Sequence, residues 1–241
     1  MKKVTVIITF LGLCFFSIQA QQTHFLNDPE GAFKQAKEYF QREQYSLAYP
    51  LLKDLELQQR ETDRSNTAIG YQEIKFYTVV CGLKQNEKGA ESKAVDFIGL
   101  EDNEARVQMM SFHLAEYYFR QNDFTKAIDL YDQVSIDNLS NREIADMKFH
   151  QGYAYFTVQR FDKAKPLLNS IRLLQDDPNY EAANYYYGFI SFYDKNYREA
   201  LDAFKVVEDH PEYEKLPLII SPLSTTCRMI NKKPLSTRNQ N

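Results

Sequence analysis

One spacing of small and large side chains recurs through most of this 241-residue chain and constrains its fold more than any other feature. A small residue is followed by an aromatic residue nine positions later, a second small residue after twelve and a large residue after sixteen. Four copies of this pattern start at Ala36, Ala115, Gly152 and Gly188. Offsets of three and four residues mark one face of an α-helix, and a polar break separates the two halves of each copy. Each copy is therefore predicted to be a hairpin of two helices.

The intervals between copies leave room for a fifth, degenerate unit. Two neighbouring intervals are 37 and 36 residues, whereas the first is 79 residues. Within it, Gly82, Ala94 and Ile98 supply two small residues and one large one, but Gln85 and Glu91 stand where aromatic residues are expected. The sequence thus predicts five helical hairpins, the second one degenerate.

The paired small residues indicate how the two helices of a hairpin pack. Small side chains at matching points let two backbones approach closely, and the large side chains a turn away fill the remaining space. A bulky side chain at Ala127 or Ala164 is expected to overpack this core, at about 1 to 3 kcal/mol.

Capping chemistry supports these helix boundaries. Ser46, Thr125 and Asp162 follow the aromatic residue of the turn and are predicted to be N-caps of the second helices. Pro50 and Pro166 then fall in the first turn, where a backbone N–H has no intrahelical partner. The first helices are predicted to start after three cap-forming pairs, Asp28-Pro29, Asp102-Asn103 and Asn179-Tyr180.

The pattern resembles the tetratricopeptide repeat (TPR), whose signature combines a small residue, a Tyr three positions later and a later Ala. The matching residues in the third copy are Leu114-Ala115, Tyr118, Ala127 and Tyr131, and Pro178 and Pro211 lie near the expected ends of units. The resemblance covers residues 28–213, lacks the Trp of the first helix, and has a slightly longer period than the usual 34. It implies an all-α fold, a TPR-type α-solenoid of about five repeats, similar to the N-terminal part of long signal-bearing TPR proteins of Gram-negative envelopes.

The first 20 residues are typical of a secretory signal peptide. Two lysines precede an apolar run over residues 4–18, and Ala20 provides a small residue at the cleavage site. The alternative is a lipoprotein signal at Cys14, but Leu13 stands where a small residue is needed. After cleavage, residues 21–27 form a short leader, no membrane span remains, and the protein is expected in the periplasm or associated with the envelope.

Residues 214–241 depart from the rest of the chain. No aromatic residue follows Tyr213, although residues 1–213 hold 34 Phe and Tyr, and no acidic residue follows Glu214. One interpretation is a flexible polar tail. The other is a slip of the reading frame in the gene. Codons that could encode residues 224–237, read in a shifted frame, permit an aromatic residue, a polar break and Lys-Ala-Leu, which are the features of another repeat. In that case the chain is a truncated fragment of a longer array.

The charge of the chain and the motifs that it lacks reduce the range of functions to consider. Residues 21–214 hold 22 basic and 33 acidic residues, a net charge of −11, which disfavours nucleic acid as a partner. No P-loop, dinucleotide loop, GxSxG or HExxH motif occurs, so we expect neither an enzyme nor a cofactor. His113 and His150 share a repeat position, but no further ligand completes a metal set. Cys81 lies in an apolar run and is expected to be buried.

The informative surface is a stripe on the first helices, formed by the residues three before, one after and four after the small residue. We call the positions Phe112, Glu116, Phe119, Phe149, Tyr153, Phe156, Tyr185, Phe189 and Phe192 the aromatic stripe; Phe33, Lys37 and Phe40 are their equivalents in the first repeat. In the TPR family this face lines the concave groove, which implies that the eight aromatic residues of the stripe bind a partner. The alternative is that the rings only pack against the next repeat.

These observations predict a non-catalytic scaffold for protein–protein interaction. The stripe lacks the set of basic residues that would clamp a carboxylate terminus, so an apolar peptide segment or helix is the expected ligand. Exposed aromatic rings favour such contacts. A glycan-binding protein on a TPR frame is the alternative, although such sites usually stack sugars on Trp, which this chain lacks.

Overall fold

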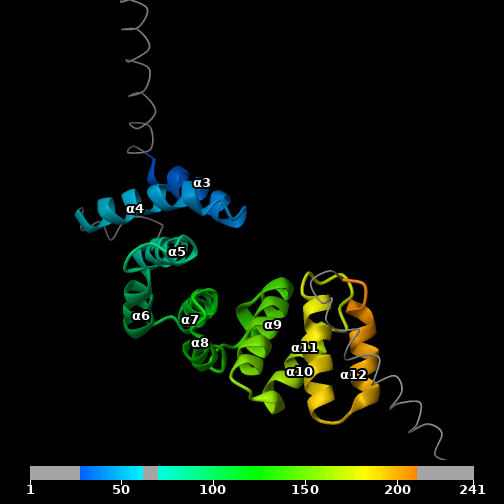
Figure 1. The fold of residues 1–241 in the computed structure, drawn as a ribbon. Helices are drawn as coiled ribbons and strands as arrows, with labels where there is room; N and C mark the ends of the chain where they lie inside the picture. The colour runs from blue at the N-terminus through cyan, green and yellow to red at the C-terminus, as the bar shows by residue number, and fades with distance from the viewer. Residues whose placement is uncertain (1–27, 62–69, 211–241) are drawn as a thin grey trace, which may run out of the picture. The chain divides into compact units, whose positions relative to one another are not determined.

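A computed structural model describes residues 28–61 and 70–210 of the chain (Figure 1). Within these ranges it contains ten α-helices, two short 3₁₀ turns and no strand, so the predicted all-α fold is confirmed. The predicted signal peptide (1–20), the leader (21–27) and the irregular tail (214–241) lie outside the described residues. No helix in the described part of the chain is both long and apolar enough to cross a membrane.

The helices follow one another as five hairpins. Their bounds are α3 Pro29–Gln41 with α4 Tyr45–Glu61, α5 Tyr71–Lys84 with α6 Ala90–Leu100, α7 Glu104–Arg120 with α8 Phe124–Tyr131, α9 Asn141–Thr157 with α10 Phe161–Ile171, and α11 Tyr180–Tyr193 with α12 Tyr197–Phe204. The 3₁₀ turns are η1 Ile136–Asn138 and η2 Lys205–Val207.

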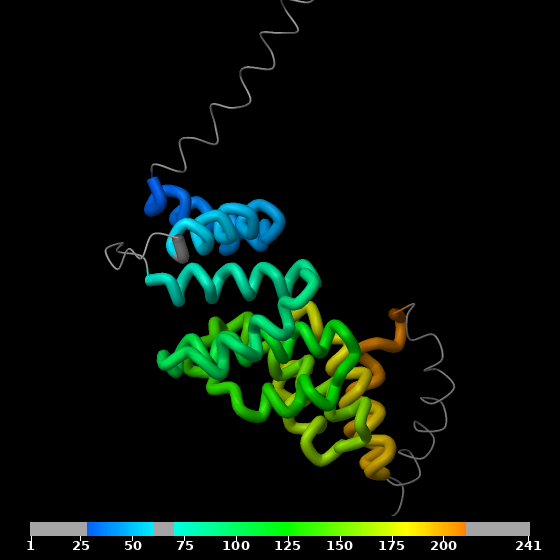
Figure 2. Tube along the Cα trace, turned by 90° about the vertical axis from the view of Figure 1, so that its left-hand side faces the viewer, coloured from blue at the N-terminus to red at the C-terminus, as the bar shows by residue number. Residues whose placement is uncertain are grey.

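The chain divides into two compact units, with the boundary between Met110 and Ser111 inside α7. In the first unit, α3 packs on α4, α4 on α5 and α5 on α6, as Figures 1 and 2 show. Cys81 on α5 belongs to the core of this unit and is a free thiol. Burial raises its pKa to about 12, so the thiol stays protonated and acts as a small apolar side chain, as predicted.

In the second unit each helix from α8 to α12 packs on the next one, and α9 also contacts α11 (Figure 2). Its core contains Tyr155, Ala164, Leu168, Tyr187 and Ile190. Consecutive hairpins therefore share one apolar core, which is the arrangement expected of a helical repeat.

The predicted interlock of small and large side chains holds the hairpins together. A Cβ at Gly152 would lie 3.1 Å from Cγ of Leu168, and one at Gly188 would lie 2.8 Å from Cδ1 of Phe204. The large residue sixteen positions along thus occupies the space that the glycine leaves open. Ala127 and Ala164, at the second small position, are fully buried.

The second helices begin two residues earlier than predicted, so the assignment of Ser46, Thr125 and Asp162 as N-caps was wrong. Each of them lies inside the first turn. In α8 the cap is Asp123, whose carboxylate accepts a hydrogen bond from the backbone N–H of Lys126 at 3.3 Å.

Because the helices start earlier, the two prolines lie deeper than the first turn. Pro50 and Pro166 are each the sixth residue of their helix and leave the carbonyls of Ser46 and Asp162 without the usual donor. All four residues are exposed, so water can hydrate these carbonyls. Exposure, rather than a position at the helix start, explains how both prolines are tolerated.

The predicted caps of the first helices agree better with the structure. Asp28 caps α3 and accepts from the N–H of Gly31 at 2.9 Å, and Asn103 accepts from the N–H of Arg106 at 3.0 Å. Asn179 precedes α11, but its side chain makes no capping hydrogen bond.

Candidate functional site

The aromatic stripe runs along α7, α9 and α11 in the second unit, three positions on each helix. Helical periodicity places these positions on one face, because offsets of four and three residues return to the same side of the helix. Its members differ widely in exposure.

Two members of the stripe belong to the core. Phe112 is 3% exposed and Phe149 is 8% exposed, so they offer almost no surface to a ligand. Phe149 packs among Ala145, Tyr155 and Tyr187 in the shared core. For these two positions the structure favours packing between repeats.

Four further members form a continuous ladder of ring contacts between successive first helices. Phe119 lies 5.8 Å from Tyr153, Tyr153 lies 5.0 Å from Tyr186, and Phe156 lies 4.9 Å from Tyr186 and 5.5 Å from Phe189, measured between ring centroids. These edge and tilted geometries are the favoured ones for aromatic pairs. The half-buried rings Phe119, Tyr153 and Phe156 therefore join one repeat to the next. Tyr185, also half-buried, packs instead within its own hairpin, 6.3 Å from the ring of Phe204.

The ladder ends in exposed rings on α11. Phe189 is 37% exposed and Phe192 is 40% exposed, and Tyr193 beside them is also exposed. Together with Tyr197 and Phe204 they line a cavity of about 320 Å³, with Lys195 at its edge. This end of the stripe combines exposure, apolar surface and concavity.

A polar cluster interrupts the stripe at Glu116, the stripe position on α7 that is not aromatic. Its buried carboxylate accepts a hydrogen bond from the hydroxyl of Tyr131 and lies 2.9 Å from Nδ1 of His150 on α9. The His150 ring stacks on Phe119 at 4.2 Å. Burial, followed by the nearby Glu116 carboxylate, raises the pKa of the Tyr131 hydroxyl well above its usual value. The tyrosine therefore remains a hydrogen-bond donor that holds Glu116 in place.

In the first repeat the equivalent positions Phe33, Lys37 and Phe40 lie on α3. Phe33 and Phe40 contact Tyr77 of α5 at centroid distances of 5.9 and 4.9 Å, and Nζ of Lys37 pairs with Glu73 at 3.0 Å. These contacts join α3 to α5, the first helices of neighbouring repeats.

The sequence did not identify three aromatic residues that complete the ladder. Tyr186 and Tyr193 lie two before and five after Gly188, and Phe161 contacts Tyr193 at 5.1 Å. The signal was present, since His150 holds the same position in the preceding repeat as Tyr186 and also stacks on the stripe. These positions touch the preceding repeat, whereas the stripe was defined by a single helix.

The two histidines that share a repeat position have different surroundings in the structure. His113 is buried beside Phe112, at a ring distance of 5.2 Å, while His150 turns to Glu116. Within residues 28–61 and 70–210, no group of three or more His, Cys, Asp or Glu side chains could hold a metal ion.

Comparisons with known proteins agree with this architecture. A family model described as tetratricopeptide repeat matches residues 110–135, which hold the end of α7 and all of α8. No curated protein sequence matches the chain.

Among solved structures, MamA of AMB-1 aligns with a TM-score of 0.53 and 17% identity over 72% of this chain and 93% of that chain. A tetratricopeptide repeat protein from Parabacteroides merdae aligns with a TM-score of 0.51 and 13% identity, over 83% and 73%. The C-terminal part of a TPR repeat-containing protein from Cytophaga hutchinsonii gives 0.52 and 17%, over 84% and 74%. At these identities the likeness concerns the fold, and the fold is a TPR-type α-solenoid.

Proposed function

We propose that this protein is a non-catalytic scaffold in the periplasm or cell envelope that binds an apolar peptide segment or helix on the aromatic stripe. The observation that carries the proposal is the exposed end of the stripe, where Phe189 and Phe192 line a cavity of about 320 Å³. Rigid aromatic side chains bind with little loss of conformational entropy and are frequent hot spots of interfaces. TPR-type folds bind protein partners, which is consistent with this use of the surface.

The buried and half-buried members of the stripe support the site rather than contact the ligand. Phe112 and Phe149 are buried in the core, while Phe119, Tyr153 and Phe156 belong to the ladder that holds Phe189 in position through Phe156, and Tyr185 packs against Phe204. A ligand would therefore contact chiefly Phe189 and Phe192, and the edges of the half-buried rings.

Selection of displayed random peptides against the immobilised full chain tests this proposal. We expect enrichment of apolar, aromatic-containing peptides, with affinities that fall about 30-fold in Phe189→Ala plus Phe192→Ala, since a hot-spot truncation costs about 2 kcal/mol. Leu173→Ala plus Leu174→Ala removes exposed apolar side chains outside the stripe and serves as the matched control. Enriched peptides that bind the Phe189/Phe192 variant as tightly as the unchanged protein would refute the site.

The location is proposed from the first 20 residues alone. N-terminal sequencing of protein recovered from fractionated Gram-negative cells should give Gln21 as the first residue, in the periplasmic fraction. Recovery of the uncleaved chain in the cytoplasm would contradict this part of the proposal.

A further inference from the structure

The degenerate second repeat differs from the fourth and fifth in the side chains that surround the glycine of its first helix. In the fourth and fifth repeats, Leu168 and Phe204 fill the space beside the glycine of the first helix. Beside Gly82 the nearest atoms are Cβ of Ala90 at 3.3 Å, Cβ of Glu87 at 3.7 Å and the ring edge of Tyr49 at 3.8 Å. Ala90, Glu87 and Tyr49 therefore surround Gly82, and Ile98, the large residue sixteen positions along, is not among its three nearest neighbours.

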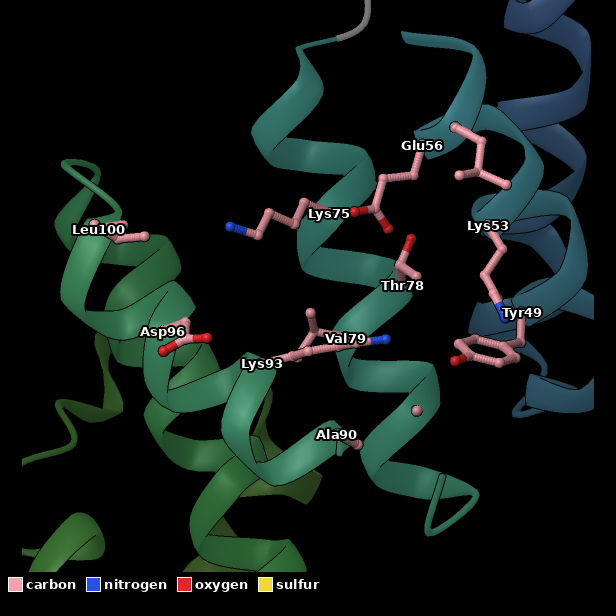
Figure 3. A pocket seen from close by; sticks show the side chains of 12 residues that line it. Tyr49, Lys53, Glu56, Lys75, Thr78, Val79, Ala90, Lys93, Asp96 and Leu100 are labelled. Atoms are coloured by element: carbon pink, nitrogen blue, oxygen red, sulfur yellow. The ribbon is translucent and has the colours of Figure 1, made fainter. Parts of the chain in front are cut away.

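The result is a cavity of about 340 Å³ between α4 and α6, above α5 (Figure 3). Each of the three helices contributes residues from one face, at helical spacing. Gly82, Ala90, Val79 and Tyr49 provide its apolar and aromatic lining. Its volume falls within the range of roughly 300 to 1,000 Å³ that is usual for small-molecule sites.

Three lysines line this cavity, one from each helix: Lys53, Lys75 and Lys93. Figure 3 shows Lys93 extending from α6 across Val79, Lys53 extending along α4 toward Tyr49, and Lys75 extending from α5 toward the side of α6. Within the part of the chain that the structure describes, none of the three forms an ion pair. Nζ of Lys53 lies 5.3 Å from the ring centroid of Tyr49 and Nζ of Lys75 lies 5.7 Å from that of Phe97, so these ammonium groups contact aromatic rings but no carboxylate, and can pair with an anion.

The remaining polar groups of the cavity modulate this charge. Glu56 and Asp96 also line it, so lysines exceed carboxylates by one, although the whole chain has a net charge of −4. Thr78 donates to the carbonyl of Ile74 at 2.8 Å, which leaves its oxygen as an acceptor only. Burial, followed by nearby Glu87 and Glu56, raises the pKa of the Tyr49 phenol, so Tyr49 remains an uncharged donor.

We propose that this lysine pocket binds a small organic anion, in which a carboxylate faces the lysines and an apolar or ring portion rests on Val79, Gly82 and Ala90. The apolar lining favours a carbon body over an inorganic ion, and the unpaired ammonium groups favour a negative charge over a neutral ligand. The site is separate from the aromatic stripe and from the partner proposed to bind there.

The test uses 4-phenylbutyrate and its neutral amide with the ¹⁵N-labelled full chain. We expect the carboxylate to shift the backbone NMR signals of Val79, Gly82 and Ala90, and the amide to bind more weakly. Removing two lysines with Lys53→Gln plus Lys93→Gln should weaken the carboxylate about threefold to tenfold and leave the amide unchanged, as partly exposed charge pairs contribute modestly. Added salt should weaken the carboxylate only.

The matched control is Lys34→Gln plus Lys88→Gln, which makes the same charge change at exposed lysines outside the pocket. A second variant, Gly82→Leu, fills the cavity and should abolish binding of both compounds, with circular dichroism confirming that the helices remain. The proposal is overturned if neither compound shifts these signals, if the amide binds as well as the carboxylate, or if the control weakens binding as much as the pocket variant. A free carboxylate and the side chain of an acidic peptide are distinguished by titrating phenylbutyrate against acetyl-Phe-Asp-amide, and stronger binding of the dipeptide would identify a peptide ligand.

Discussion

Adding one methyl group at Gly188 tests whether hairpin interlocking determines stability. In Gly188→Ala the new Cβ would lie 2.8 Å from both Cδ1 and Cε1 of Phe204, closer than such atoms approach in proteins. Phe204 is fully buried, and the only relief for its ring is to shift toward the cavity of about 320 Å³ that it lines. Overpacking of this kind costs about 1 to 3 kcal/mol, and the higher helix propensity of Ala returns about 1 kcal/mol. We expect a net loss of about 1 kcal/mol of unfolding free energy.

A series of glycines makes this prediction quantitative. At Gly152 the Cβ would lie 3.1 Å from Leu168, so the loss in Gly152→Ala should be smaller, while Gly99 on α6 has no neighbouring atom within 4 Å. Gly99→Ala should therefore gain up to about 1 kcal/mol from helix propensity alone. We therefore expect Gly188→Ala to lose the most unfolding free energy, Gly152→Ala to lose less, and Gly99→Ala to gain.

Two measurements test this prediction. Hydrogen exchange of the amides in α11 and α12 reports the local stability of the fifth hairpin, and urea unfolding followed by circular dichroism reports the unfolding free energy of the whole protein. A repeat protein transmits a change mainly to neighbouring repeats, so protection should fall first in the fifth hairpin. In a Phe204→Leu background the clash is relieved, and Gly188→Ala should become less destabilising. A stabilising Gly188→Ala, or the same loss in both backgrounds, would refute the packing argument.

Three further predictions concern helix ends, prolines and pH. Ser140→Ala removes the capping box with Glu143 at the start of α9 and should lower stability by about 1 kcal/mol in thermal unfolding, whereas Ser140→Asp should retain most of it. Pro166→Ala restores a donor for the carbonyl of Asp162 and should raise the urea midpoint of unfolding. An interior Pro destabilises a helix by about 3 kcal/mol, whereas its restriction of the unfolded chain stabilises the protein by less than about 1 kcal/mol. An unchanged midpoint would contradict the interior position of Pro166. The pKa of Glu199 is lowered, chiefly by the hydrogen bond from Tyr187, so its contribution to stability is complete above the ordinary Glu pKa and is lost as pH falls through the lowered value. Near pH 7 the unfolding free energy of the unchanged protein should thus exceed that of Glu199→Gln by a modest amount, because this side chain is partly exposed. The difference should vanish in acid.

The fold could be predicted from the sequence because its cause is local and repeated. Ala115, Gly152 and Gly188 recur at nearly constant intervals; the structure buries all three and contains the predicted close helix contact at both glycines. The cap assignments failed for an equally local reason. A Ser, Thr or Asp beside a turn can occupy either the cap or the first turn, and the polar break just before it determined the start, as Asp123 does for α8.

The exposure of the stripe could not be predicted in the same way, because it depends on the side chains of the next repeat rather than on its own helix. Phe156 and Phe192 hold the same repeat position, yet Phe156 is covered by Tyr186 and Phe189, while Phe192 is exposed. The same dependence explains the lysine pocket. Gly152 and Gly188 lie against the large residue sixteen positions along, whereas Gly82 lies against Ala90, Glu87 and Tyr49 and lines the cavity between α4 and α6. A repeat pattern thus predicts where space is made, whereas its departures from the pattern decide which spaces stay open to a ligand.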